Sequence, residues 1–140
     1  MSLPPLIDGV TLTLPADVRL LGVVRRVVET SAELAGFSRR GVYEVVLAVH
    51  EACANVIEHG YLGMTGQQLT VVCRSGGEGL EVRVRDQGRP FDIGVAPELP
   101  PDEFREGGRG VFLIRRLMDE VISERSADGV NELRLFRRQV

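Results

Sequence analysis

Apolar positions repeat with helical spacing in three segments of the chain. The first segment, residues 16–36, ends at a glycine, and the second, residues 39–59, follows Ser38 as a predicted N-cap and ends at Gly60. The third spans about 110–118. The expected buried face of the first helix consists of Leu20, Leu21, Val24, Val27, Val28 and Leu34. Three helices are therefore predicted.

Alternating apolar and polar positions predict five strands. They cover residues 9–14, 68–75 and 80–86, followed by a hairpin of residues 119–126 and 131–138 around "ADG". The element order is β-α-α-β-β-loop-α-β-β. This order predicts an α+β fold, a two-layer sandwich of a mostly antiparallel sheet with helices on one face. It differs from the strict alternation of a doubly wound nucleotide-binding fold.

The size and composition of the chain are those of one globular domain. We expect residues 1–140 to form a single domain, since 44% of the residues are hydrophobic and 26% are charged. No apolar run approaches the length of a membrane span, and "MSLPPLIDGV" lacks the basic and apolar regions of a secretion signal. A cytoplasmic protein without a membrane partner is therefore expected.

Charge and cysteine content narrow the possible chemistry. The net charge of −3 gives no basic footprint for direct nucleic-acid binding. All 17 basic residues are Arg, so a catalytic Lys or the Lys of a Walker-type phosphate loop is excluded. The two cysteines, Cys53 and Cys73, lie in apolar stretches, and we expect them to be buried free thiols.

A polar pair interrupts the second predicted helix. At about 100° per residue, Asn55 lies about 40° from Glu51 around the helix, on the same stripe. Carboxylate and carboxamide oxygens of this kind suit Mg²⁺. The alternative is an ordinary solvated face, because Glu-x-x-x-Asn alone is a weak pattern. A zinc site of the His-Glu-x-x-His type is excluded because position 54 is Ala.

Two further segments have candidate ligand-binding chemistry. Asp86 ends a strand and can accept a hydrogen bond from an exocyclic amine, while Gly88 lets a flat ring approach the backbone. A long loop of about 20 residues then leads to "EGGRGVFLIRRLM", where glycines precede a helix. Free amides at such a helix start, with an added Arg, favour a phosphate. The alternatives are a strand-ending turn and a flexible hinge.

Taken together, these segments resemble the GHKL ATPases, whose nucleotide-binding fold is called the Bergerat fold. More narrowly, the chain is similar to the bacterial anti-sigma-factor serine-protein kinases. "EACANVIEHGY" matches their N-box, "DQGRPFD" their first glycine box, and "GGRGVFLIRRLMDEV" their second glycine box. The resemblance covers nearly the whole chain and implies ATP and Mg²⁺ as cofactors.

The resemblance also implies a role for each matching residue. Asn55 would coordinate Mg²⁺ on the ATP phosphates, and Glu51 would act as general base toward the incoming hydroxyl. Asp86 would accept from the adenine amine, and Gly88 would form the floor of the adenine pocket. The remaining implied nucleotide-binding residues are His59 and Gly60 at the pocket edge, Gly108, Arg109 and Gly110 around the phosphates, and Arg105 in a lid spanning about 92–107.

Two positions depart from the family pattern, Ile93, where many relatives have Pro, and Asn131. Relatives often have Thr near the start of the last strand, on the adenine side, where this chain has Asn131. Asn can still donate and accept hydrogen bonds, so Asn131 stays a candidate nucleotide-binding residue.

The partners implied by the resemblance are proteins. The expected substrate is a Ser on an anti-anti-sigma (STAS) protein, the inhibited partner is a sigma factor, and the kinase is expected to be a homodimer. Four readings stay open: a kinase and anti-sigma factor, a STAS-protein kinase without a sigma factor, a non-catalytic ATP-binding module, and a fragment of a larger sensor kinase. The "VTLTL" edge of the first strand is a plausible pairing element for a dimer.

Overall fold

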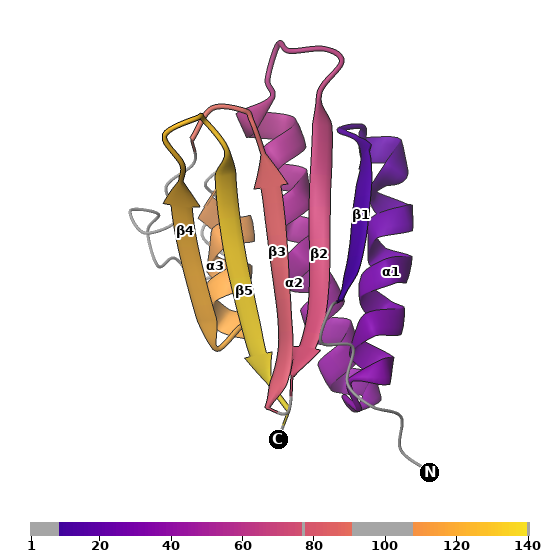
Figure 1. The fold of residues 1–140 in the computed structure, drawn as a ribbon. Helices are drawn as coiled ribbons and strands as arrows, with labels where there is room; N and C mark the ends of the chain where they lie inside the picture. The colour runs from indigo at the N-terminus through magenta and orange to yellow at the C-terminus, as the bar shows by residue number, and fades with distance from the viewer. Residues whose placement is uncertain (1–8, 77, 91–107, 140) are drawn as a thin grey trace.

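The computed structural model describes residues 9–76, 78–90 and 108–139, which include a five-stranded sheet (Figure 1). The strand order is β1-β2-β3-β5-β4, and every pairing among these strands is antiparallel. The strands are β1 (Val10–Pro15), β2 (Gln68–Gly76), β3 (Gly79–Asp86), β4 (Glu120–Arg125) and β5 (Asn131–Arg138). All five coincide closely with the segments predicted from alternation.

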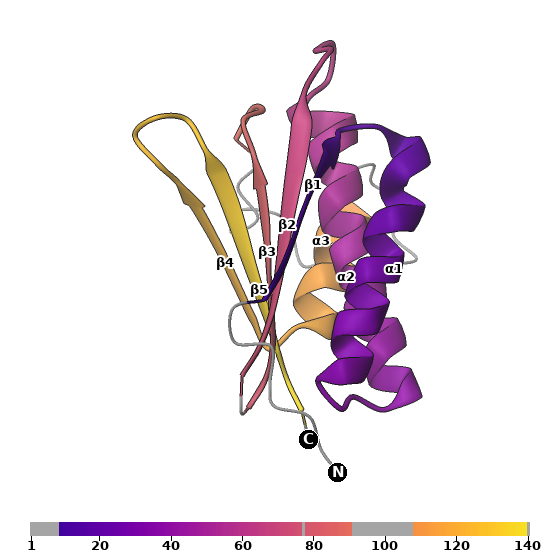
Figure 2. The ribbon, with the colours of Figure 1, turned by 45° about the vertical axis from the view of Figure 1, so that its right-hand side comes forward.

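Three α-helices cover one face of this sheet, as Figure 2 shows. They are α1 (Leu21–Leu34), α2 (Arg39–Asn55) and α3 (Gly108–Leu117). Helix α2 lies between the other two and packs against both. The other face of the sheet has no helix among the described residues. The predicted α+β fold, a two-layer sandwich of the Bergerat type, is confirmed.

The core lies between the helices and the sheet. It is formed by aliphatic side chains that recur at every second strand position and along one stripe of each helix. The largest fully buried side chains are Leu69, Leu80, Ile114, Leu135, Val24, Val28, Val45, Val49, Val71, Val82, Val84 and Val111. One predicted core residue is wrong: Leu34 is 53% exposed, because it lies about 120° from Val28 around α1 and so outside the buried stripe.

The first two helices differ from their predicted bounds. Before α1, residues Val18–Leu20 form a short 3₁₀ turn, capped by the Asp17 carboxylate, which accepts from the Arg19 backbone N–H at 2.9 Å. At its other end, α2 does not continue to residue 59 as an α-helix. Residues Val56–Gly60 instead form a π-helical turn (η2), in which the Tyr61 N–H donates to the Val56 carbonyl at 2.8 Å.

The two thiols are buried and free, as predicted. Burial raises the pKa of Cys53 to about 12 and the pKa of Cys73 to about 11. Both thiols therefore stay protonated and contribute as small apolar side chains. Within the described segments, none of the helices combines the length and the apolar character needed to cross a membrane.

Candidate nucleotide site

The site begins at the C-terminal end of α2, where Glu51 and Asn55 lie on one stripe, half-buried. This stripe faces the start of α3. A Cβ atom added to Gly110 would lie 2.9 Å from Glu51 Oε2, 3.5 Å from Asn55 Oδ1 and 3.6 Å from Asn55 Nδ2. The absence of a side chain at Gly110 thus lets the first turn of α3 lie directly against the polar pair. The two segments, more than fifty residues apart in the sequence, form one wall.

The start of α3 has the character of an anion site. Gly108, Arg109 and Gly110 form the first turn of this helix, whose backbone N–H groups have no partners within the helix. The side chain of Arg109 lies outside the described part of the structure, as does Arg105 together with the predicted lid. The backbone geometry alone places the positive end of the helix dipole beside Glu51 and Asn55.

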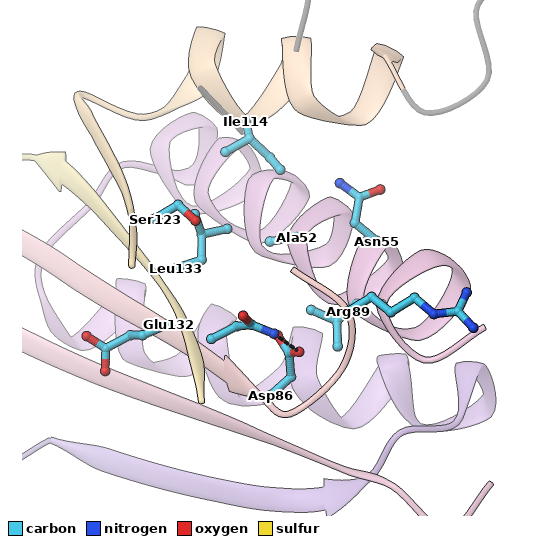
Figure 3. Close-up of a pocket in the computed structure, with 11 residues that line it drawn as sticks. Ala52, Asn55, Asp86, Arg89, Ile114, Ser123, Glu132 and Leu133 are labelled. Atoms are coloured by element: carbon cyan, nitrogen blue, oxygen red, sulfur yellow. Dashed lines mark hydrogen bonds between the residues drawn. The ribbon is translucent and has the colours of Figure 1, made fainter. Parts of the chain in front are cut away.

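A cavity extends from Asn55 to the end of β3 (Figure 3). Polar groups line its two ends, and aliphatic side chains line the wall between them. The lining residues are Ala52, Asn55, Val56, Gly60, Asp86, Arg89, Ile114, Ser123, Asn131, Glu132 and Leu133. A mostly apolar slot with a few directed polar groups is the usual form of a site for a flat ring.

Asp86 is held in one orientation at the end of this cavity. Its Oδ1 atom accepts from the Gly88 backbone N–H at 2.8 Å and from Asn131 Nδ2 at 2.8 Å. Among the described residues, none donates to Asp86 Oδ2. The carboxylate is therefore fixed through one oxygen and has the other available to accept from a ligand.

The structure gives a different reason for glycine at position 88 than the predicted ring contact. A Cβ atom added to Gly88 would lie 2.6 Å from the Gly60 carbonyl oxygen and 3.0 Å from the Tyr61 ring. The Arg89 N–H donates to the same carbonyl at 2.8 Å. Gly88 thus lets the turn after β3 pack directly on the backbone of η2.

Tyr61 strengthens the same junction. Its hydroxyl donates to the Gln68 carbonyl at 2.8 Å and accepts from the Gln87 backbone N–H at 2.7 Å. Burial raises the pKa of Tyr61, while the bond from the Gln87 N–H lowers it and the Asp86 charge raises it. The hydroxyl stays protonated and links the end of η2 to the start of β2 and the end of β3.

The predicted site residues fall into three groups. The structure brings together Glu51, Asn55 and Gly110 at one end, and Gly60, Asp86, Gly88 and Asn131 at the other. His59 is exposed and is not among the residues that line the cavity. Sequence reasoning missed Arg89 and Ser123, which line the cavity, and Arg125, which donates to the Gly88 carbonyl at 3.3 Å. Arg89 follows Gly88 directly in the sequence and adds a positive charge to the cavity lining. The arginine of "QGRP" is the sequence signal that could have indicated this charge.

Comparisons with known proteins agree on one family. Residues 14–137 match the family described as histidine kinase-like ATPase domain. The chain is 33% identical over 122 residues to the serine-protein kinase RsbW of Bacillus licheniformis. The aligned region covers 81% of this chain and 76% of that protein. It is 36% identical over 122 residues to RsbW of Listeria innocua, and the aligned region covers 81% of this chain and 78% of that protein.

A solved structure shares the fold. The crystal structure of the RsbU and RsbW domains of Rv1364c from Mycobacterium tuberculosis matches with a TM-score of 0.64 and 22% sequence identity. The match covers 97% of this chain and 32% of that chain, so this protein spans about a third of that longer one. At this level of identity the likeness establishes the fold alone.

Proposed function

This chain belongs to the histidine kinase-like ATPase family, within it to the group of RsbW-type serine-protein kinases, and we propose that it is an ATP-dependent protein-serine kinase. The observation that supports the proposal most directly is the convergence of three distant segments on one cavity. The end of α2, the end of β3 and the start of α3 supply a polar pair, an orienting carboxylate and an anion-binding helix end. Together, these features suit the metal ion, the base and the phosphates of a bound nucleoside triphosphate.

Asp86 and the apolar wall would bind the adenine. The Oδ2 atom of Asp86, to which none of the described residues donates, suits the exocyclic amine, and Ile114 and Leu133 offer apolar surface to the ring. The triphosphate would then extend toward the first turn of α3, where backbone amides and the helix dipole favour negative charge. Arg89 also lines the cavity and carries a positive charge.

Asn55 is the residue that would hold Mg²⁺. Its Oδ1 atom is a hard ligand beside the phosphate-binding turn, and the described residues contain no cluster of three acidic or histidine ligands. One protein oxygen suits Mg²⁺ in nucleotide sites, because the ion takes its other ligands from phosphates and water. When bound, Mg²⁺ would neutralise charge on the phosphates.

Glu51 would act as the general base. It lies one helical turn before Asn55 and within contact distance of Gly110, where the γ-phosphate would lie. A serine hydroxyl oxygen attacks the γ-phosphorus, its proton passes to the Glu51 carboxylate, and the bond from the γ-phosphorus to the bridging oxygen breaks to release ADP. The opposite wall of α2 is apolar, so the carboxylate and the metal ligand share the one polar stripe of the helix.

The proposed acceptor is a Ser on a STAS protein, supported by the family resemblance and by the serine-protein kinase names of the relatives. Phosphorylation there would add close to two negative charges to an interface and release the kinase for a second partner, a sigma factor. Such a partner would place the reaction in the cytoplasm. A homodimer also stays a proposal, supported by the position of β1 at an edge of the described sheet.

The test of this function is a phosphoryl-transfer assay with the E51Q variant. Glu51→Gln keeps the shape of the side chain but removes the base, so we expect unchanged ATP affinity and at least a hundredfold slower transfer to a cognate STAS protein. Glu58→Gln is the matched control, because Glu58 is exposed and does not line the cavity. Wild-type protein that binds ATP without any transfer would favour a non-catalytic nucleotide-binding module.

A further inference from the structure

A row of three polar residues crosses the end of the sheet beside the cavity. Asp86 on β3 pairs with Asn131 on β5, and Asn131 pairs with Arg125 on β4. We propose that Arg125 and Asn131 are positioning residues that orient Asp86 and thereby select a purine with an amine over one with a carbonyl. This inference rests on the proposed nucleotide site and goes beyond it by assigning base selectivity to two residues that act through Asp86.

Strand alternation places the three residues on the face that the helices cover. The preceding core-facing pair consists of Val84 on β3 and Leu133 on β5, with Ser123 next to Leu133 on β4. Asp86, Asn131 and Arg125 each lie two residues from these positions and so project from the same side of the sheet. The row is therefore the polar end of the apolar wall that lines the cavity.

Arg125 fixes which way the Asn131 amide points. Its Nη1 atom donates to Asn131 Oδ1 at 2.7 Å and to the Gly88 carbonyl at 3.3 Å. A guanidinium can only donate, so the oxygen of the amide has to face Arg125. The NH₂ group of Asn131 consequently faces β3, where it donates to Asp86 Oδ1 at 2.8 Å and to the Gly88 carbonyl at 2.9 Å.

This arrangement determines what Asp86 offers to a ligand. Oδ1 is occupied by Asn131 and by the Gly88 N–H, so within the described part of the chain Oδ2 is the acceptor that remains. Figure 3 shows Asp86 at this end of the cavity. A carboxylate oxygen attracts the amine of adenine and repels a carbonyl oxygen at the same ring position. An inverted Asn131 amide would instead turn its own oxygen toward Asp86 and push the carboxylate away. Arg125 prevents this inversion.

Asn131 is thus fully engaged with the protein. Both hydrogens and the oxygen of its amide have partners within the chain, although the residue lines the cavity. Its contribution to base selection is therefore indirect, through the carboxylate that it holds. Arg125 makes no direct hydrogen bond to Asp86 in this arrangement and acts on it through its bonds to Asn131 and to the Gly88 carbonyl.

The test compares the affinities of ATP and inosine triphosphate, in which a carbonyl replaces the amine. Titration calorimetry with magnesium would be done on the wild type and on the R125A, R125K and N131A variants. We expect the ratio of the two affinities to fall about tenfold in N131A and a few-fold in R125A, since one bond to a charged group is lost or weakened. R125K keeps a cationic donor and should recover part of the ratio. Arg134→Ala is the control, because Arg134 lies on β5 but on the opposite face, and it should leave the ratio unchanged.

The outcomes separate selectivity from folding. Melting temperatures without nucleotide report whether a variant is merely less stable, whereas the affinity ratio reports base selection. If the variants weaken ATP and inosine triphosphate equally, or leave the wild-type preference intact, the positioning role is refuted while the nucleotide site stands. Wild-type protein that binds neither nucleotide would overturn the proposed function, and the inference with it.

Discussion

Replacing Gly110 with Ala separates the stability of this protein from its proposed activity. Gly110 is the third residue of α3, and its φ angle is not positive, so Ala fits the backbone there. Ala is favoured over Gly by about 0.5–1 kcal/mol inside a helix, and we expect the lower end of this range in the first turn. For a chain of this size, a gain of about 0.5 kcal/mol corresponds to a rise of about 2 °C in melting temperature.

The added methyl group, however, has to occupy space beside the polar pair. It would lie 2.9 Å from Glu51 Oε2, where an ordinary contact is at least 3.4 Å, so the carboxylate has to retreat by about 0.5 Å. Glu51 is flexible and moves at little cost to folding. Misplacing a reacting group by a fraction of an ångström to 1 Å slows a reaction by about ten- to a hundredfold. We therefore expect a more stable protein that transfers phosphate about ten- to a hundredfold more slowly.

Two measurements decide this prediction. Differential scanning calorimetry gives the melting temperature without nucleotide, and single-turnover transfer of labelled phosphate to a STAS protein gives the rate. Gly22→Ala is the matched control, because Gly22 lies in the first turn of α1 and a Cβ atom there meets only Arg25 Nη2, at 3.4 Å. The control should gain stability without losing transfer. An unchanged transfer rate in G110A would refute the contact between α3 and Glu51 as the arrangement used in the reaction.

Two further predictions concern stability. Tyr61→Phe removes the donor to the Gln68 carbonyl and the acceptor of the Gln87 N–H, so we expect about 1–2 kcal/mol less free energy of unfolding in urea titrations, about 1 kcal/mol for each lost bond. A loss under about 0.5 kcal/mol would contradict the bridging role. Burial alone would raise the pKa of Glu44, but its bonds to Arg137 and Arg40, both 3.1 Å, lower the pKa overall. The pKa of Glu44 is lower in the folded state than in the unfolded state. The pairing therefore stabilises the protein at pH values above the unfolded-state pKa, and this stabilisation is lost as the pH falls through the folded-state pKa. Glu44→Gln should therefore cost about 1 kcal/mol at pH 7 and nothing once the pH is well below the folded-state pKa, and a pH-independent difference would refute the ionic origin.

The fold could be predicted largely from local patterns. Alternation in "LEVRVRD" predicts a strand with Leu80, Val82 and Val84 on one face, and all three are fully buried. The pairing of Glu51 and Asn55 on one stripe of α2 also follows from helical geometry alone. Both features depend on residues close in sequence, and the period of a strand or a helix determines which of those side chains share a face.

Other features depend on contacts that no local pattern contains. The π-helical turn after Asn55 is one, since its sequence "VIEHG" suits an ordinary α-helix and the predicted helix accordingly ran to residue 59. The role of Arg125 is another, because it requires the register of β4 on β5 and of β5 on β3. Asn131 is a candidate from the sequence only because it departs from the family pattern. Two of its partners, Asp86 and Gly88, lie 45 and 43 residues away and reach it only in the folded sheet.

The π-helical turn matters because it connects the two ends of the proposed site through direct backbone contacts. It brings the Gly60 carbonyl to the turn after β3, where Gly88 contacts it and the Arg89 N–H donates to it. Asn55, the proposed metal ligand, directly precedes this turn, and Asp86, the proposed adenine acceptor, directly precedes the segment that Gly60 contacts. The two residues are thus linked by one backbone hydrogen bond and one close glycine contact, which favours a fixed distance between phosphate and base recognition before any nucleotide binds. A site prearranged in this way spends little binding energy on ordering its own residues, which leaves more of that energy for positioning the γ-phosphate against Glu51.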